Sequence, residues 1–190
     1  MFTIKKKYFL IIESIKDIDL KNIKKRNKFS IIYRNKKKLE NTTDLLNFRR
    51  FCKIKSIKFY VANNTKLAVL LNSDGLYLSA FNKSFRSLLL KKSNFKIIGS
   101  AHNLKEISLK FKQGCEIILF SKLFLVSYDI KGTFLGVIRF NNYLKIFKNL
   151  IPLGGISINN LNNLNNINCQ GFALMSEVKK KPAKIFSRLL

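Results

Sequence analysis

The sequence predicts a compact (β/α)8 barrel, or TIM barrel, formed by residues 1–190 as one domain. About eight short apolar runs recur along the chain, with mixed, helix-like segments between them. Each run is continuously apolar instead of alternating with polar residues, which is typical of parallel strands buried on both faces. The chain lies slightly below the usual length of such barrels but is long enough to bury a sizeable core.

Eight runs are the predicted strands, and their ranges are 8–12, 29–33, 58–62, 75–79, 96–101, 116–121, 150–155 and 171–176. Helices are predicted over 41–52, with a capping signal at Thr42 or Thr43, over 103–114, with Gly114 as the stop, and over 136–149. The Asn-rich segment 159–168 has apolar residues at helical spacing, which predicts a short amphipathic helix. An open sheet of flavodoxin type is the alternative fold, but no Gly-rich loop follows the first strand.

Cysteine and histidine usage restricts the class of protein. Cys52, Cys115 and Cys169 are far apart and odd in number, which indicates free thiols in a reducing compartment, and we expect a cytoplasmic protein. His102 is the only histidine, so a multi-histidine metal site is excluded, and we expect His102 to cap the helix that follows it. No apolar run is long enough to span a membrane. We interpret the apolar N-terminal run as a strand and not as a signal peptide.

The formal net charge of +27 has two interpretations. Such a charge favours phosphorylated ligands, anionic lipids or nucleic acid. However, the lysines are spread along the chain and asparagine is also abundant, so we attribute most of the charge to composition. A basic nucleic-acid-binding protein is the remote alternative, because the chain has no recognisable RNA or DNA motif. The sequence leaves the oligomeric state open, a homo-oligomer included.

Polar residues and glycines end or follow several of the predicted strands, where the active sites of such barrels lie. They are Arg34, Lys36, Asn63, Asn82, Ser100, Gly154, Gly155 and Ser176. The glycine pair leaves backbone N–H groups uncovered just before a predicted helix, and Ser176 ends the next strand. Because the last strands of barrels often build a phosphate site between them, these three residues predict one. Asp74 precedes a strand and is interpreted as a turn residue.

Five motifs resemble the thiamine-phosphate synthase/TenI family in order and spacing: "IIYRNK", "LAVLLNSDGLYLS", "IIGSAHNLKE", "IPLGGI" and "GFALMS". The resemblance runs from about Tyr8 to Val178. It implies a (β/α)8 barrel and a transferase of thiamine biosynthesis. Such an enzyme couples a hydroxymethylpyrimidine diphosphate to a thiazole phosphate and releases diphosphate.

The resemblance also implies site residues. Arg34 and Lys36 match the family's cations that hold the diphosphate, and Ser100 matches the serine before Ala-His. The thiazole phosphate would lie at the positions that match the family's Gly-Gly turn and final serine, which are Gly154, Gly155, Met175 and Ser176. The expected partners are therefore small phosphorylated substrates.

The chain departs from the family where Mg²⁺ is bound. The two Mg²⁺-binding aspartates fall on Asn63 and Asn82, and losing both charges weakens a site for a hard cation. In the loop after the sixth strand, the family's lysine falls on Asp129, with Lys131 as an accessory candidate two positions on. Two functions stay open: a synthase with an altered diphosphate site, and a TenI-like or degenerate homologue that binds a thiazole phosphate or related ligand without coupling it.

Overall fold

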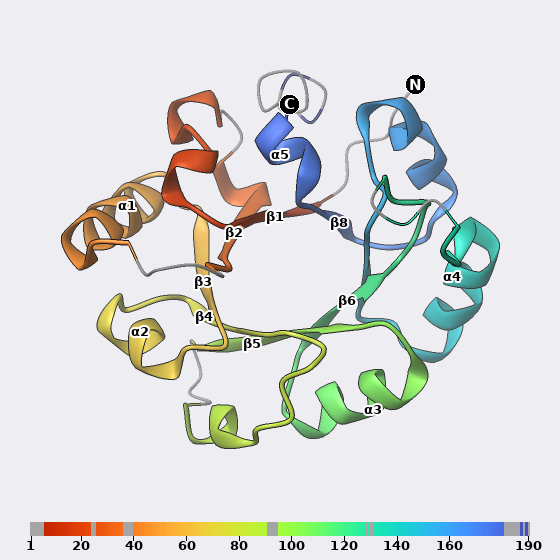
Figure 1. Cartoon of the computed structure of the whole chain (residues 1–190), viewed down its shortest axis with the longest axis horizontal. Coiled ribbons are helices and arrows are strands. Elements are labelled where there is room, and N and C mark those ends of the chain that lie inside the picture. The colour runs from red at the N-terminus through yellow and green to blue at the C-terminus, as the bar shows by residue number, and fades with distance from the viewer. Residues whose placement is uncertain are drawn as a thin grey trace.

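Eight parallel strands close into a barrel in chain order in the computed structural model of the protein (Figure 1). Each strand pairs with the next, and β8 pairs with β1. The structure describes residues 6–23, 26–35, 40–90, 95–127, 129, 131–180, 187 and 189, with only the backbone of residues 26, 179 and 180. The predicted (β/α)8 barrel is confirmed.

The strands are β1 (Lys7–Ile12), β2 (Phe29–Tyr33), β3 (Lys58–Ala62), β4 (Gly75–Leu78), β5 (Lys96–Ala101), β6 (Ile117–Ser121), β7 (Leu150–Leu153) and β8 (Gly171–Leu174). Each predicted run contains one of them. The last two strands end earlier than predicted for a local reason. Gly154 and Gly155 have φ angles of +93° and +69°, which no strand residue adopts, and Ser176 already begins a helix.

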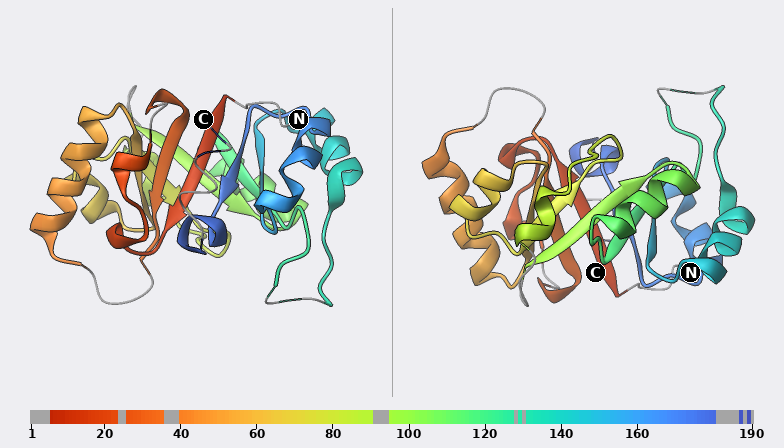
Figure 2. Two further views of the ribbon diagram at one scale, coloured as in Figure 1. Left: turned by 90° about the horizontal axis from the view of Figure 1, so that it is seen from above. Right: turned by 90° about the horizontal axis from the view of Figure 1, so that it is seen from below.

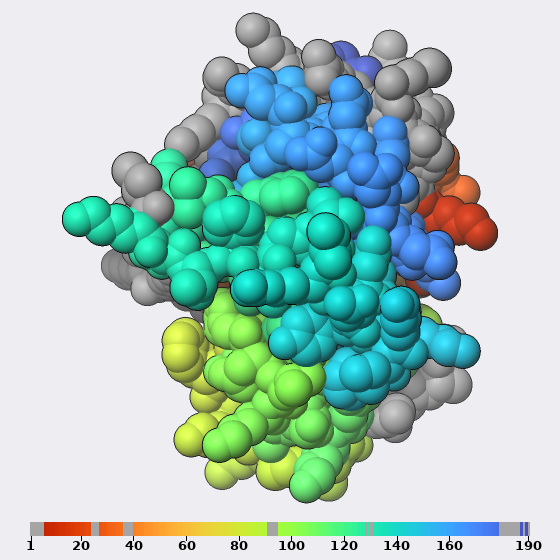
Figure 3. Space-filling model, turned by 90° about the vertical axis from the view of Figure 1, so that its right-hand side faces the viewer, coloured from red at the N-terminus to blue at the C-terminus, as the bar shows by residue number. Residues whose placement is uncertain are grey.

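The α-helices are α1 (Thr42–Ile54), α2 (Thr65–Leu70), α3 (Leu104–Lys112), α4 (Gly136–Ile146) and α5 (Ser176–Lys180). The 3₁₀ segments are η1 (Ile15–Asp17), η2 (Leu20–Asn22), η3 (Arg26–Lys28), η4 (Arg86–Leu90) and η5 (Ile158–Asn166). The amphipathic Asn-rich helix is therefore confirmed in place, as the 3₁₀ segment η5, with Leu161, Leu164 and Ile167 buried. Figure 3 shows η5 in blue beside α4 in cyan and α3 in green on one side of the barrel.

Two predicted caps are wrong. Asn41, and not Thr42 or Thr43, is the N-cap of α1, because its side-chain oxygen accepts the Thr43 N–H at 2.9 Å. Asn103, and not His102, caps α3 by accepting the Glu106 N–H at 2.9 Å. Asparagine is as good an N-cap as serine or threonine, so the asparagine directly before each helix takes the N-cap position.

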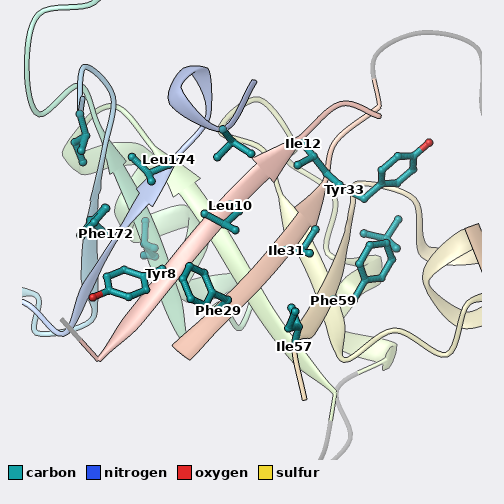
Figure 4. Packing of buried hydrophobic residues seen from close by; sticks show 14 of the residues in the cluster. Tyr8, Leu10, Ile12, Phe29, Ile31, Tyr33, Ile57, Phe59, Phe172 and Leu174 are labelled. Atoms are coloured by element: carbon teal, nitrogen blue, oxygen red, sulfur yellow. The ribbon is translucent and has the colours of Figure 1, made fainter. Parts of the chain in front are cut away.

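Alternation along the strands divides the core into two layers. Leu10, Ile31, Phe59 and Leu174 point outward and pack under the helices, where Figure 4 shows the part of this layer around β1, β2, β3 and β8. The residues of opposite parity fill the barrel and are Phe9, Ile11, Ile32, Tyr60, Tyr77, Ile98, Leu119, Ile151 and Ala173. Because side chains alternate between faces, this parity decides which residues enter the mouth of the barrel.

Asp74 holds the start of β4, as its interpretation as a turn residue implies. Its Oδ2 accepts the Phe59 N–H at 2.7 Å and lies 3.2 Å from the Arg49 guanidinium. Cys52, Cys115 and Cys169 are free thiols, and the first two are buried. Within the described residues, no helix is long and apolar enough to cross a membrane.

Candidate functional site

A cavity of about 420 Å³ opens at the carboxyl ends of the strands. Its size lies within the range of small-molecule sites. Among its lining residues are six that the sequence predicted: Arg34, Ser100, Gly154, Gly155, Met175 and Ser176. The loop between β6 and α4 extends beyond the barrel at the same end, where α5 also lies (Figure 2). Strand parity explains much of this convergence, because Arg34, Ser100 and Met175 each lie two residues beyond a barrel-filling side chain.

Gly154 and Gly155 form a backbone turn that only glycine fits. At Gly155, a Cβ atom would meet the carbonyl oxygens of Phe124 and Leu125, so the loop after β6 lies directly against it. The Gly154 carbonyl accepts the Phe124 N–H at 3.0 Å. Neither glycine N–H has an acceptor among the residues that the structure describes. Two uncovered donors in a cavity wall are an arrangement that binds an anion.

Tyr77 lies on the floor of the cavity beside Ser100. Burial raises the pKa of the Tyr77 phenol, while a hydrogen bond to Ser100 and the nearby charge of Arg34 lower it. The phenol is therefore neutral at physiological pH and provides a hydroxyl rather than a charge. Arg34 is half-buried, and its backbone N–H donates to the Ile12 carbonyl at 2.8 Å, which continues the ladder between β1 and β2.

A second polar group lies at the end of β6. The Ser121 hydroxyl and His102 Nδ1 are 2.8 Å apart, and Phe81 lies beside the His102 ring with a centroid separation of 6.3 Å. Lys122 follows Ser121 in the cavity wall, and its ammonium forms an ion pair with Asp129. His102 therefore contributes its side chain to the cavity and not to the helix cap.

Asn63 and Asn82 come together, but outside the cavity lining. Asn63 Oδ1 accepts the Ser79 N–H and the Asn82 side-chain N–H, each at 3.0 Å. Asn82 Oδ1 accepts the Ser84 N–H at 2.9 Å. From behind, the buried Lys110 donates to the Asn82 carbonyl at 2.7 Å, and burial lowers the pKa of Lys110.

These residues do not fit Mg²⁺. Mg²⁺ prefers carboxylate oxygens in near-octahedral geometry, whereas both amide oxygens here already accept hydrogen bonds and the ammonium group of Lys110 donates to the Asn82 carbonyl. Among the described residues, no group of three or more His, Cys, Asp or Glu side chains is suited to hold a metal ion.

Two further predicted residues, Lys36 and Lys131, are not among the described lining residues of the cavity. Lys36 lies outside the described residues, so its prediction is untested. Lys131 is exposed and does not line the cavity. A larger open groove of about 800 Å³ lies at the opposite end of the barrel, beside Lys6, Lys145 and Gln170, and contains none of the predicted site residues.

Sequence reasoning missed Tyr77, Ser121, Lys122 and Glu177 as lining residues. The alternation of side chains along a strand could have identified Tyr77 and Ser121, because both lie on the inner face of their strands. Lys122 lies just beyond the end of β6 and Glu177 at the start of the short helix α5, and no periodic pattern predicts the direction of either side chain.

Known proteins resemble this chain in sequence and in fold. The family model described as thiamine monophosphate synthase (TMP-TENI) matches residues 15–178. A thiamine-phosphate synthase from Geobacillus thermodenitrificans is 22% identical over 140 residues, which cover 70% of this chain and 62% of that protein. The chain thus matches less than two thirds of the length of this curated relative.

Solved structures share the fold. Thiamine phosphate pyrophosphorylase from Pyrococcus furiosus superposes with a TM-score of 0.73 at 17% identity and 97% coverage of both chains. 3-Keto-L-gulonate-6-phosphate decarboxylase from Vibrio cholerae superposes with a TM-score of 0.61 at 12% identity, covering 98% of this chain and 99% of its own. At such identities the similarity shows the fold alone, and one fold carries several activities. The match of the family model over most of the chain shows that this protein belongs to the thiamine monophosphate synthase (TMP-TENI) family.

Proposed function

We propose that the protein acts in thiamine biosynthesis as a transferase of the thiamine-phosphate synthase type. It would couple a hydroxymethylpyrimidine diphosphate to a thiazole phosphate and release diphosphate. One observation carries the proposal: Arg34, Ser100, Gly154, Gly155, Met175 and Ser176 line one cavity at the carboxyl ends of the strands. A cytoplasmic location remains a prediction from cysteine usage.

The phosphate of the thiazole is assigned to Gly154, Gly155 and Ser176. The two glycines offer N–H groups without an acceptor in the described structure, and Ser176 offers a hydroxyl on the same cavity wall. Uncharged donors of this kind bind phosphate without needing a counter-ion of their own. Met175, Leu153 and Ile156 supply apolar surface for a ring next to this end of the cavity.

The coupling breaks the C–O bond between the pyrimidine methylene and the diphosphate, which leaves with the bonding electrons. The thiazole nitrogen then forms the new bond to that carbon. We assign the stabilisation of the negative charge on the leaving diphosphate to Arg34, a cation that lines the cavity, with Lys36 as its predicted companion. Fixed cations in a partly closed cavity act more strongly than the same charges in water.

Binding without coupling is the second candidate function. The hydrogen-bonded amides of Asn63 and Asn82 favour it, because they occupy the positions where the family's metal-binding carboxylates are expected. On this alternative, the phosphate half of the cavity holds a thiazole phosphate or a related ligand, and no diphosphate is released.

Coupling is tested by incubating the purified protein with both substrates, with and without Mg²⁺, and measuring thiamine phosphate. Turnover supports the transferase, and absence of turnover together with binding supports the second candidate.

Calorimetry with thiazole phosphate tests the site itself. Ser176→Asp places a negative charge in the phosphate subsite and should abolish binding, whereas Ser108→Asp, on the exposed side of α3, should not. Unchanged binding by Ser176→Asp would overturn the site assignment.

A further inference from the structure

Lys122 is the cationic side chain next to the glycine turn. A Cβ atom built on Gly154 would lie 3.2 Å from the Cα of Lys122 and 3.4 Å from its Cβ, so the two residues are packed side by side. The Lys122 side chain lines the cavity and is 24% exposed. Its backbone is anchored, because the Lys122 carbonyl accepts the Leu135 N–H at 2.9 Å. Lys122 is thus fixed at the wall that carries the two uncovered N–H groups.

Asp129 neutralises this lysine from outside the cavity. The two side chains form an ion pair, and the Asp129 side chain is 41% exposed. Two backbone hydrogen bonds of 3.1 Å hold the turn around Asp129. The Asp129 N–H donates to the Val126 carbonyl, and the Asp129 carbonyl accepts the Gly132 N–H. Asp129 itself does not line the cavity. The carboxylate therefore engages the lysine without entering the space in which a ligand would lie.

The ion pair is weak enough to be exchanged. A partly exposed pair between a lysine and a carboxylate typically contributes about 0–1 kcal/mol, since water screens the attraction and both side chains lose freedom. A phosphate has more negative charge and more acceptor oxygens than a carboxylate, and lysine binds phosphate as a mobile point charge. In the cavity, a phosphate would also gain the Gly154 and Gly155 N–H groups, which Asp129 does not use.

We propose that Lys122 is the cation that binds the ligand phosphate at Gly154 and Gly155, and that Asp129 is its counter-ion in the free protein. Ligand binding then exchanges a carboxylate for a phosphate on the same ammonium group. The inference rests on the proposed function, since it requires a phosphate at the glycine turn. It assigns the cation of this subsite to the residue after β6, in a loop where the lysine expected from the resemblance is replaced by Asp129.

The two members of the pair predict opposite effects. In calorimetry with thiazole phosphate, Lys122→Met should weaken binding by about tenfold or more, which corresponds to about 1.4 kcal/mol. Asp129→Asn should strengthen binding by about three- to tenfold, because the lysine no longer has to leave a counter-ion. A loop residue with only a structural role would weaken binding in both variants. In the background of Lys122→Met, Asp129→Asn should have no further effect.

Two controls separate local contact from general charge. Lys131→Met removes the same charge from the same loop at an exposed position outside the cavity, so affinity should stay within about twofold of the unmodified protein. Binding of the thiazole alcohol, which lacks the phosphate, should be the same in all variants. Melting temperatures of each variant confirm that the compared proteins are folded.

The outcomes distinguish the two proposals. If the unmodified protein binds thiazole phosphate and Ser176→Asp abolishes binding, the phosphate site stands. Weaker or equal binding by Asp129→Asn, or an equal loss in Lys131→Met and Lys122→Met, then overturns the role of Lys122 alone. If the unmodified protein does not bind thiazole phosphate, the proposed function fails and the role of Lys122 fails with it.

Discussion

Asn82 donates a hydrogen bond of 3.0 Å from its side-chain nitrogen to the side-chain oxygen of Asn63. The two positions at which the resemblance places metal-binding aspartates are therefore joined by a neutral contact. An aspartate pair at the same distance would place two negative charges together, which a bound cation or a shared proton would have to offset. The two asparagine side chains therefore hydrogen-bond to each other where the resemblance places a metal centre.

Restoring both carboxylates should make stability depend on Mg²⁺. In the double variant Asn63→Asp, Asn82→Asp, the repulsion and the lost hydrogen bond should cost about 1 kcal/mol, or about 2–4 °C in melting temperature, when a chelator is present. Millimolar Mg²⁺ should recover this loss, which thermal unfolding with and without the ion measures. The double variant Asn162→Asp, Asn163→Asp adds the same charge at exposed sites of η5 and serves as the control. A stabilisation by Mg²⁺ that is as large in the unmodified protein would contradict the prediction.

Gly155→Ala should destabilise the protein more than Gly136→Ala. Both glycines have a φ angle of +69°, so both alanines carry the same backbone cost of about 1–2 kcal/mol. At Gly136 the nearest atom to a new Cβ is 4.0 Å away, whereas at Gly155 the Cβ would overlap two carbonyl oxygens of the loop after β6. We expect an additional loss of about 1–3 kcal/mol for Gly155→Ala, measured by urea unfolding. Equal losses would show that the loop moves away freely.

Cys52 should make the protein less stable at alkaline pH. Burial raises the pKa of the Cys52 thiol from 9.0 to about 12. Two smaller effects oppose each other, since the charge of Arg49 lowers this pKa and the charge of Asp74 raises it. Because the folded pKa is above the unfolded one, this contribution to stability is complete below pH 9 and is lost as the pH rises towards 12. Between these values the unfolded state releases a proton that the folded state keeps, so the free energy of unfolding falls by about 1.4 kcal/mol per pH unit.

Cys52→Ala tests this pH dependence. At neutral pH the variant should have a lower free energy of unfolding, since it leaves a small cavity, and the readout is therefore the slope. From pH 9.5 to 10.5, denaturant unfolding of the variant should show a slope that is shallower by about one proton. If both proteins have parallel pH profiles, the Cys52 thiol is not shielded from water as the structure indicates.

Glu177→Gln should strengthen the binding of a phosphorylated ligand. Glu177 lines the cavity next to Ser176, where its carboxylate repels a phosphate. Removing the charge should tighten thiazole phosphate binding by about three- to tenfold in calorimetry, or about 1 kcal/mol. Glu116→Gln is the matched control, because Glu116 lies outside the cavity lining and is paired with Lys96 at 3.0 Å. No difference between the two variants would place the Glu177 charge away from the ligand.

The strands and the helices α1, α3, α4 and η5 were predictable because burial imposes a period on the chain. Continuous apolar runs placed all eight strands to within two residues at either end. The N-caps of α1 and α3 were mispredicted because several neighbouring residues can cap a helix, and the backbone geometry selects Asn41 and Asn103 among them.

The candidate site was predictable only in part. Residues that continue the inner face of a strand, such as Ser100 and Met175, enter the cavity because their direction follows from parity. The placement of Lys122 and the pairing of Asn63 with Asn82 depend on turns after the strands. In these turns the direction of a side chain is set by contacts with residues that are distant in sequence.

Hydrophobic periodicity predicted the eight strands and favoured a closed barrel, and with it the end at which a ligand would lie, because these depend on which residues must leave water. Tertiary packing decided the chemistry at that end. It brought the carbonyl oxygens of Phe124 and Leu125 against Gly155 and paired Lys122 with Asp129. Hydrogen bonds and ion pairs act over a few ångströms between segments that are far apart in the chain, so no local pattern of residues specifies them.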